Sequence, residues 1–138
     1  MSTSITACIF DLDGVIVDTA RFHYLSWQKI AEELSITFTE EDNEQLKGIS
    51  RMRSLDILLD LGNVTLSQER KEELAAQKNV MFREFILQMT PADVLPGVKS
   101  FLDELQAAGV KIALGSASKN AMTILEQVEL THYFEAII

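Results

Sequence analysis

The chain is poor in cysteine and in basic residues, and both shortages limit what it can be. Cys8 is the only cysteine among 138 residues, so no disulfide can form within one chain, which fits a reducing cytoplasm. There are 12 lysines and arginines against 21 aspartates and glutamates, which gives a net charge of −9. Nonspecific nucleic-acid binding requires basic side chains that neutralise phosphates, so this balance argues against it. A small phosphorylated ligand needs only a local basic pocket and stays possible.

Long hydrophobic runs are lacking as well. No apolar stretch approaches the roughly 20 residues of a membrane-spanning helix, and the N-terminus has no basic segment followed by an apolar one. We therefore expect a cytoplasmic protein that does not bind a membrane. Hydrophobic residues make up 47% of the chain, as in an ordinary globular protein, and its length alone suggests one domain.

Proline is scarce too, and both prolines lie in residues 90–97, which we interpret as a linker. After this linker, strand and helix patterns alternate with short loops, which is typical of a parallel α/β sheet. An apolar run at 5–10 predicts another strand, and the residues between it and the linker show only helical patterns. The predicted fold class is therefore α/β. It has a parallel, doubly wound, Rossmann-like core, here incomplete, from residues 1–15 and 91–138, with an all-helical cap domain inserted at 16–90.

Hydrophobic spacing and capping residues predict the individual elements. Ser50 suits the N-cap of a helix that ends at Gly62, and Ser67 can cap the long helix that follows. The expected helices cover residues 19–34, 40–47, 50–62, 67–89, 98–108 and 119–129, and the expected strands cover residues 5–10, 110–114 and 134–138.

The most informative segment follows the first strand, where the apolar run ends at Asp11 and Asp13 and a glycine comes next. Because successive side chains of a strand point to opposite faces, these two carboxylates lie on one side and Leu12 faces away. Clustered carboxylates are unfavourable unless a cation or a reaction needs them. A calcium loop is excluded, because its fifth and twelfth positions would be Val15 and Phe22. A plain turn is the other alternative, but it requires neither the apolar strand nor the paired acids.

Residues 11–19, Asp-Leu-Asp-Gly-Val-Ile-Val-Asp-Thr, resemble the first signature of the haloacid dehalogenase superfamily of phosphoryl-transfer enzymes. The resemblance implies that Asp11 is the nucleophile that becomes an aspartyl phosphate and that Asp13 is the general acid/base. It also implies Mg²⁺ held by Asp11 and Asp13, because a negative nucleophile that attacks a dianion needs a metal to offset the repulsion.

Two further segments, residues 43–51 and 116–120, resemble the cap loop and the second signature of the β-phosphoglucomutases within that superfamily. A helical cap after the first strand also resembles one group of the superfamily. The substrate-binding residues implied by this resemblance are Thr19, His23, Trp27, Lys47, Gly48, Ser50, Arg51, Ser54, Lys78, Ser116, Ala117, Ser118, Lys119 and Asn120.

The residue pattern alone leaves some of these roles open. Lys78 and His23 fall in apolar helical rows, where a lysine can extend outward to solvent and a histidine near a helix start can be half exposed. By resemblance the pair couples cap closure to the positioning of Asp13. Arg51, at the first position of its helix, suits a second phosphate that is not transferred, or is simply solvated.

The loop after the second core strand, Gly115 to Asn120, leads into a helix, and helix N-termini favour anions. Ser116 can donate its hydroxyl to a phosphate, with the Ala117 N–H beside it. Lys119 and Asn120 are expected in the first helical turn, where they could contact phosphate. The alternative is that Ser118 only caps the helix and Lys119 is a surface residue.

Together these features predict a Mg²⁺-dependent enzyme that resembles the β-phosphoglucomutases and acts on a phosphorylated hexose. It would interconvert β-glucose 1-phosphate and glucose 6-phosphate through an aspartyl phosphate and β-glucose 1,6-bisphosphate. A sugar-phosphate phosphatase of the same superfamily is the first alternative. A catalytically incomplete fragment is the second, because the superfamily also uses a downstream lysine and downstream metal-binding acids, and nothing follows Ile138. We therefore expect a chain truncated at its C-terminus, and a monomer in the complete form.

Overall fold

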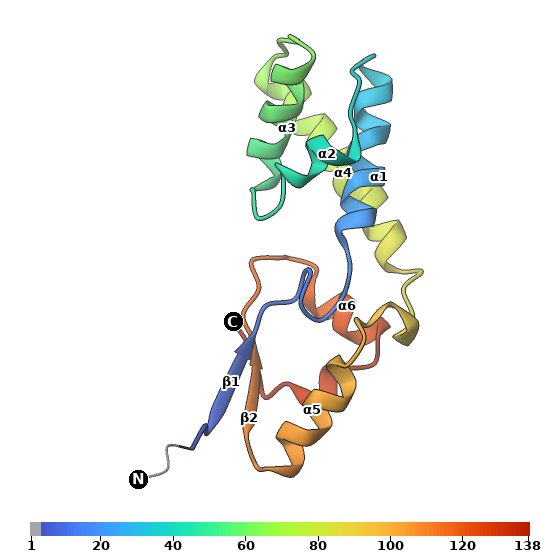
Figure 1. Ribbon diagram of the computed structural model, residues 1–138. Helices are drawn as coiled ribbons and strands as arrows, with labels where there is room; N and C mark the ends of the chain where they lie inside the picture. Colours follow the sequence, from blue (N-terminus) through green and yellow to red (C-terminus); the bar gives the residue numbers. More distant parts are fainter. Residues whose placement is uncertain (1–3) are drawn as a thin grey trace. The chain divides into compact units, whose positions relative to one another are not determined.

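The computed structural model describes residues 4–138, which form two compact units. Residues 4–19 and Ile86–Ile138 make up the core unit, and Ala20–Phe85 make up the helical unit. Figure 1 labels the strands β1 and β2 and the helices α5 and α6 of the core unit, and the helices α1 to α4 of the helical unit. No helix in the described part of the chain is long and apolar enough to cross a membrane.

The core unit contains a parallel sheet whose described strands follow the order β1-β2-β3. Phe10 pairs with Leu114 across β1 and β2, and Leu114 pairs with Ile137 across β2 and β3, so the carboxyl ends of the three strands meet at one edge. A parallel sheet with helical connections confirms the predicted α/β fold class. The elements of this unit are β1 (Ala7–Phe10), η1 (Pro91–Asp93), α5 (Val98–Ala107), β2 (Lys111–Leu114), α6 (Ala121–Gln127), η2 (Thr131–Tyr133) and β3 (Ala136–Ile137).

Apolar side chains from the sheet and its helices form the interior of the core unit. In β2, Ile112 and Leu114 are buried while Lys111 is exposed, which is the alternation that a strand produces. Leu102 of α5 and Leu125 of α6 are wholly buried as well. These contacts fix the sheet edge from which the loops after β1 and β2 emerge.

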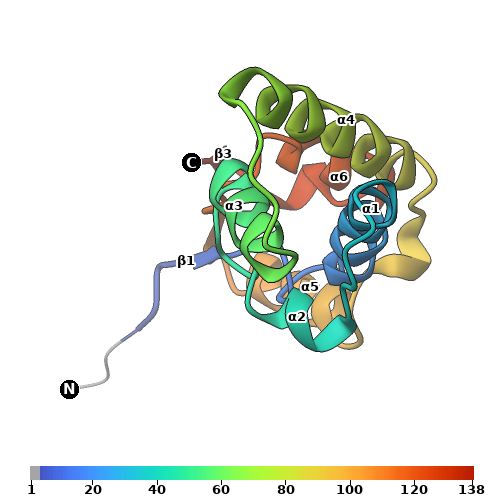
Figure 2. The same ribbon diagram turned by 90° about the horizontal axis from the view of Figure 1, so that it is seen from above.

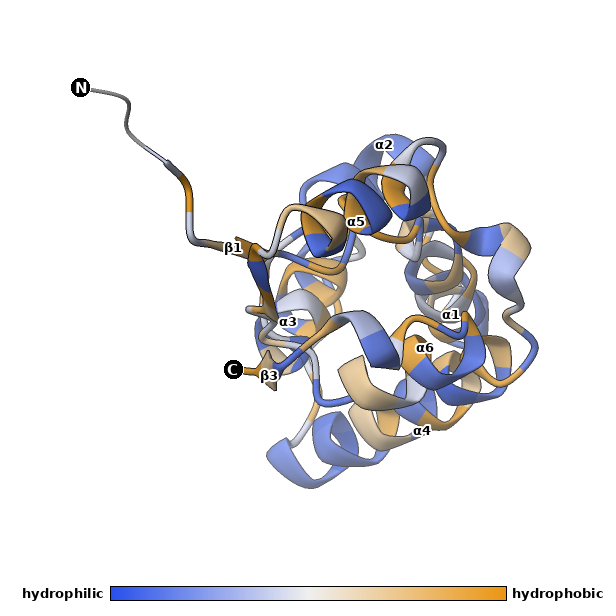
Figure 3. Cartoon of the chain, turned by 90° about the horizontal axis from the view of Figure 1, so that it is seen from below, coloured by the Kyte–Doolittle hydropathy of each residue, from blue (hydrophilic) through white to orange (hydrophobic). Residues whose placement is uncertain are grey.

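The helical unit has its own apolar core. Its helices are α1 (Ala20–Glu33), α2 (Glu40–Glu44), α3 (Arg51–Leu61) and α4 (Gln68–Ile86), which Figure 2 shows from above. Trp27 and Ile30 of α1, Leu55 and Leu58 of α3, and Leu74 of α4 belong to one buried cluster. Residues 68–73, the first turns of α4, are hydrophilic by contrast (Figure 3). The helical spacing of apolar residues in the sequence therefore marks the faces that pack together.

Two connections predicted to belong to the helical insertion belong to the core unit instead. Ile16 and Val17 are wholly buried, and the Ile16 carbonyl accepts a hydrogen bond from the Leu95 N–H at 2.9 Å. In the second connection, the Gln127 side-chain amide donates to the carbonyl oxygen of Leu87 at 2.7 Å. These bonds join residues far apart in the sequence, so helical spacing could not reveal them.

Several predicted elements are shorter in the structure. The expected helix 40–47 ends at Glu44, the helix 67–89 ends at Ile86, and the strand 134–138 is reduced to Ala136–Ile137. By contrast, the third helix has the predicted ends, with Ser50 as N-cap and Gly62 as C-cap. Caps are local interactions and can be read from neighbouring residues, whereas the point at which a helix frays depends on what packs beside it.

Replacing Leu55 by alanine should destabilise the helical unit by about 2–5 kcal/mol, because the wholly buried side chain would leave a cavity. Leu61 lies on the same helix but is 44% exposed, so Leu61→Ala serves as the matched control and should cost only about 0.5 kcal/mol. Trp27 is the only tryptophan and lies in the same cluster as Leu55, so urea unfolding followed by its fluorescence reports on this unit. Equal losses in the two variants would contradict the assignment of this core.

Candidate active site

The two aspartates stand at a tight turn that begins where β1 ends. The carbonyl oxygen of Leu12 accepts hydrogen bonds from the N–H groups of Val15, Ile16 and Val17 at 3.3, 2.9 and 3.2 Å. Gly14 has φ +78°, a conformation that favours glycine, and its N–H donates to the Val17 carbonyl at 2.8 Å. The buried Leu12 side chain anchors this turn from the opposite face. The turn therefore holds the segment Asp11 to Asp13 at the carboxyl end of the strand.

The carboxylates of Asp11 and Asp13 have different surroundings. Asp11 is exposed, and its Oδ1 accepts a hydrogen bond from the Leu12 N–H at 2.7 Å. Asp13 is half-buried, and its Oδ1 accepts a hydrogen bond from the hydroxyl of Thr19, a residue with no exposed surface. One acid is thus open to an incoming group, while the other is held by a buried hydroxyl. Sequence reasoning treated Thr19 as a substrate-binding residue and missed this bond to Asp13.

The loop after β2 lies at the same sheet edge as Asp11. The Gly115 N–H donates to the Phe10 carbonyl at 2.7 Å, so the residues that follow β1 and β2 are neighbours. Ser116 directly follows Gly115, and its N–H donates to the Ile138 carbonyl at 3.1 Å. Parallel α/β folds bind ligands at the carboxyl ends of their strands. The register of β1 and β2 therefore places the aspartate pair and the serine loop, both predicted to belong to the site, at the same sheet edge.

The serine loop is longer than predicted, because α6 begins at Ala121. Lys119 and Asn120 thus precede the helix, and the expectation that they form its first turn is wrong. The reason is local: Ser116 Oγ accepts the Ser118 N–H at 3.1 Å, and Ser118 Oγ accepts the Asn120 N–H at 3.2 Å. These bonds hold the backbone in consecutive turns, so Ser118 is not the helix cap. Ala117 and Lys119 are exposed.

The loop between α2 and α3 carries three of the predicted ligand residues, Lys47, Gly48 and Ser50. Gly48 has φ +74°, which turns the chain after Lys47. The Lys47 ammonium pairs with the Glu44 carboxylate at 2.8 Å, and both side chains are more than half exposed. Such a surface pair contributes little to stability, so Lys47 can exchange Glu44 for another anion.

At the end of this loop, Ser50 caps α3 by accepting the Arg53 N–H on its hydroxyl at 3.3 Å. Arg51 is the first residue of the helix and is half-buried, which confirms its predicted position. Ser54 is buried one turn further on, with its N–H bonded to the Ser50 carbonyl at 2.8 Å. A guanidinium beside a helix N-terminus is a favourable place for an anion.

His23 and Lys78 form a direct pair inside the helical unit. Lys78 Nζ lies 2.8 Å from His23 Nδ1, and Lys78 is only 4% exposed, so its predicted alternative, extension to solvent, is wrong. Burial, and then the charge of Lys78, lowers the pKa of His23 from 6.5 to about 3. The imidazole is therefore neutral at ordinary pH. Trp27, one turn after His23, is buried in the same core.

The acid pair offers part of a magnesium site. Magnesium is commonly held by one or two carboxylates, with water and substrate phosphate completing six oxygen ligands. Asp11 and Asp13 can supply that protein share, and the exposure of Asp11 leaves space for the other ligands. Among residues 4–138 there is no group of three or more His, Cys, Asp or Glu side chains that could hold a metal without such help.

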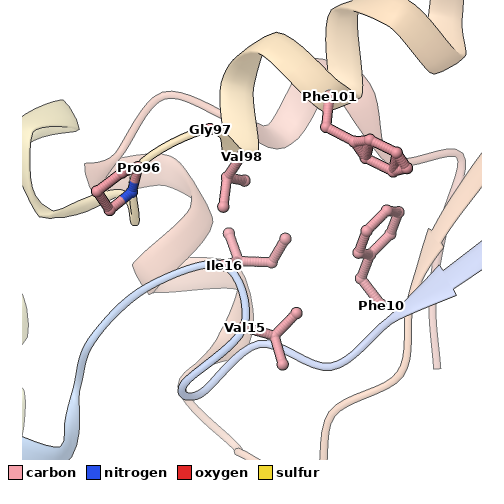
Figure 4. A pocket seen from close by; sticks show the side chains of 7 residues that line it. All are labelled: Phe10, Val15, Ile16, Pro96, Gly97, Val98 and Phe101. Atoms are coloured by element: carbon pink, nitrogen blue, oxygen red, sulfur yellow. The ribbon is translucent and has the colours of Figure 1, made fainter.

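An open pocket of about 290 Å³ lies beside the aspartate turn but has a different character. Phe10 and Phe101 meet there edge to face, with ring centroids 6.0 Å apart, and Val15 and Ile16 line the wall (Figure 4). Its lining residues carry no charged or polar side chain. A phosphate has no partner there among side chains, so the pocket is not the candidate phosphate site.

Comparison with known proteins identifies the class. The family model of the haloacid dehalogenase-like hydrolases matches residues 5–138, and the chain belongs to this family. It is 43% identical to a β-phosphoglucomutase of Bacillus subtilis over 134 residues, covering 96% of this chain and 59% of that protein. It is 26% identical to a phosphorylated carbohydrates phosphatase of Thermotoga maritima, covering 96% of this chain and 60% of that protein.

A solved structure gives the same relationship. The β-phosphoglucomutase of Clostridium difficile matches with a TM-score of 0.89 and 44% identity, covering 97% of this chain and 61% of that one. The chain thus spans about three fifths of the length of the relatives it matches. These findings confirm the resemblance to the haloacid dehalogenase superfamily and, within it, to the β-phosphoglucomutases.

The lowered pKa of His23 predicts a pH-dependent stability of the helical unit. Below its unfolded pKa of 6.5 the unfolded chain binds a proton that the folded chain does not bind until about pH 3. Stability is therefore lost as the pH falls through this range. Replacing His23 by asparagine should reduce that loss, because the asparagine side chain stays neutral and its oxygen can still accept a hydrogen bond from Lys78. Urea unfolding followed by Trp27 fluorescence at several pH values measures it.

His132→Asn is the matched control, because His132 is exposed and lies in the core unit. It should leave the pH dependence of the Trp27 transition unchanged. Equal pH dependence in the wild type and the His23 variant would contradict a histidine held neutral by its surroundings.

Proposed function

We propose that the protein is a phosphosugar mutase that interconverts β-glucose 1-phosphate and glucose 6-phosphate. The observation that carries this proposal is the pairing of Asp11 and Asp13 at the sheet edge, next to Ser116, in a chain 43% identical to a β-phosphoglucomutase. The proposal concerns the whole protein, because the relatives are longer than this chain. A single, half-buried cysteine supports action in the reducing cytoplasm.

In this proposal Asp11 is the nucleophile. One of its carboxylate oxygens attacks phosphorus, the bond from phosphorus to the sugar oxygen breaks, and an aspartyl phosphate forms. Its exposure supports this role, since an incoming phosphate must reach the oxygen that attacks. This phosphoryl group comes from a bisphosphate, and its transfer from Asp11 to the free 6-hydroxyl of β-glucose 1-phosphate gives β-glucose 1,6-bisphosphate and frees the Asp11 carboxylate. After the sugar reorients, the second half-reaction returns a phosphoryl group to Asp11 and releases the product.

Asp13 is the proposed general acid/base, which gives a proton to the leaving sugar oxygen and takes one from the attacking hydroxyl. The hydrogen bond from Thr19 supports this role, because a buried hydroxyl restricts the positions that the carboxylate can take. Ser116 and the Ala117 N–H would donate to the transferred phosphate, and Lys119 and Asn120 would bind it from the exposed loop before α6. Each of these groups would stabilise the negative charge of the phosphate during its transfer.

A mutase must also bind a second phosphate that is not being transferred. Arg51 at the start of α3 is the proposed ligand, assisted by Lys47, Gly48, Ser50 and Ser54 of the same loop and helix turn. The helix dipole and the planar guanidinium both favour a dianion there. His23, Trp27 and Lys78 are proposed to support the sugar from the interior of the helical unit.

Magnesium is the proposed cofactor, with Asp11 and Asp13 as its protein ligands. When bound, it would offset the repulsion between the aspartate nucleophile and the phosphate dianion. Phosphate oxygens and water would complete the shell, as the limited number of acids at the turn requires.

A sugar-phosphate phosphatase is the second candidate, and the 26% identity to the Thermotoga phosphatase supports it. The chemistry at Asp11 would be the same, but water would accept the phosphoryl group in place of a sugar hydroxyl. The loop around Arg51 favours the mutase, because an enzyme that only hydrolyses a phosphate ester does not need to bind a second phosphate.

A product assay on the full-length protein tests the proposal. With β-glucose 1-phosphate, Mg²⁺ and a trace of bisphosphate, we expect glucose 6-phosphate with little free phosphate. Asp11→Asn should lower the rate at least about a thousandfold, because an amide cannot form the phosphoenzyme. Asp18→Asn is the matched control, since Asp18 is an exposed acid just after the same turn and should retain activity. Free phosphate as the main product would favour the phosphatase, and an unimpaired Asp11 variant would refute both.

A further inference from the structure

The His23–Lys78 pair lies within a quartet of side chains formed by α1 and α4. His23 and Trp27 are four residues apart on α1, and Lys78 and Phe82 are four residues apart on α4, so each pair shares one face of its helix. The Phe82 ring stacks on the His23 ring, with centroids 4.0 Å apart and planes inclined by 15°. The quartet thus joins two helices through one polar contact and several ring contacts.

The Lys78 ammonium lies between two aromatic faces. Its Nζ is 4.6 Å from the centroid of Phe82 and 5.1 Å from the centroid of Trp27, both within the range of a cation–π attraction. Both rings are only 2% exposed, so water does not weaken this attraction. Burying an ammonium is unfavourable by itself, and the two π faces and the imidazole offset part of that cost.

Hydrogen-bond chemistry then determines the state of the imidazole. An ammonium can only donate, so at 2.8 Å His23 Nδ1 must be the acceptor and cannot carry a hydrogen. In a neutral imidazole the hydrogen is then on Nε2. The low pKa of His23 agrees with a ring that stays neutral in this setting.

We propose that Phe82 and Trp27 are positioning residues, forming an aromatic cage that holds the Lys78 ammonium against His23 Nδ1 and fixes His23 as the Nε2–H tautomer. Phe82 contributes twice, because it stacks on the imidazole and also faces the ammonium. The cage is a property of the helical unit and stands without any assumption about the reaction.

Its consequence for catalysis rests on the proposed function. A histidine fixed in this way offers ligand oxygens a hydrogen-bond donor at Nε2 and cannot exchange protons with substrate through Nδ1. General acid/base chemistry is then left to Asp13. The cage would set the direction of that donor and the place of the Lys78 charge.

Nuclear magnetic resonance of the 138-residue chain tests the cage without any turnover. Long-range proton–nitrogen correlations report the tautomer of each imidazole, and the chain has only two histidines, with exposed His132 as an internal reference. We expect the Nε2–H pattern for His23. We also expect the ε-CH₂ protons of Lys78 to be shifted upfield of those of the other lysines, because they adjoin a nitrogen that lies over two rings.

Three variants make the test specific. Phe82→Leu should move the Lys78 ε-CH₂ signals toward those of the other lysines and give a mixture of the two His23 tautomers. Phe82→Tyr keeps an aromatic ring and should show the upfield Lys78 signals and the Nε2–H pattern of the wild type. Phe85→Leu is the matched control, because Phe85 lies on the same helix but stacks on Phe22, 5.7 Å away, and it should change neither signal. Circular dichroism establishes that each variant keeps its helices.

A mixed or Nδ1–H pattern for His23 in the wild-type chain would overturn the proposal, even if Phe82→Leu did not fold. Unchanged Lys78 and His23 signals in a folded Phe82→Leu variant would overturn it as well. A protein that shows the cage signatures but makes no glucose 6-phosphate would refute the proposed function alone.

Discussion

The turn that follows β1 is the constraint on which the candidate site depends. One carbonyl, that of Leu12, accepts three successive N–H groups, and the chain can do this only because Gly14 adopts a left-handed conformation. The same turn leaves Asp11 open at the sheet edge, brings Asp13 to the Thr19 hydroxyl, and directs Val17 to pair with Val94. A change in this turn would therefore displace both carboxylates and the connection to the helical unit together.

The Val17–Val94 pairing also explains how a large insertion is compatible with a parallel sheet. β1 and β2 are neighbours although the whole helical unit separates them in the sequence. Closing a long flexible loop costs entropy. The helical unit has its own buried core and therefore does not behave as a flexible loop. The Val17–Val94 pairing holds the segments that lead into and out of the helical unit side by side within the core unit.

Local signals in the sequence predicted more of this structure than tertiary ones could. The apolar run before Asp11 predicted a strand ending in paired acids, and Ser50 predicted the start of α3, because both depend on neighbouring residues. The boundary of the helical unit was misplaced, because Ile16 and Val17 bond to Leu95 and Val94, which are distant in the sequence. The start of α6 was misplaced because the hydroxyls of Ser116 and Ser118 accept hydrogen bonds from the loop backbone, although Ser118 could have capped a helix.

The residues that broke the sequence patterns have a common physical meaning. Paired acids at the end of an apolar strand repel each other, and a lysine buried in an apolar helical row carries a desolvation cost, and a purely structural chain would avoid both. In the helical unit the structure offsets that cost internally, since Lys78 has the imidazole and two rings as partners. At the sheet edge, by contrast, Asp11 accepts a hydrogen bond from its neighbour Leu12, and its carboxylate stays exposed to solvent. The lysine is thus already stabilised by its own unit, whereas the nucleophile candidate is left open for a ligand from outside the chain.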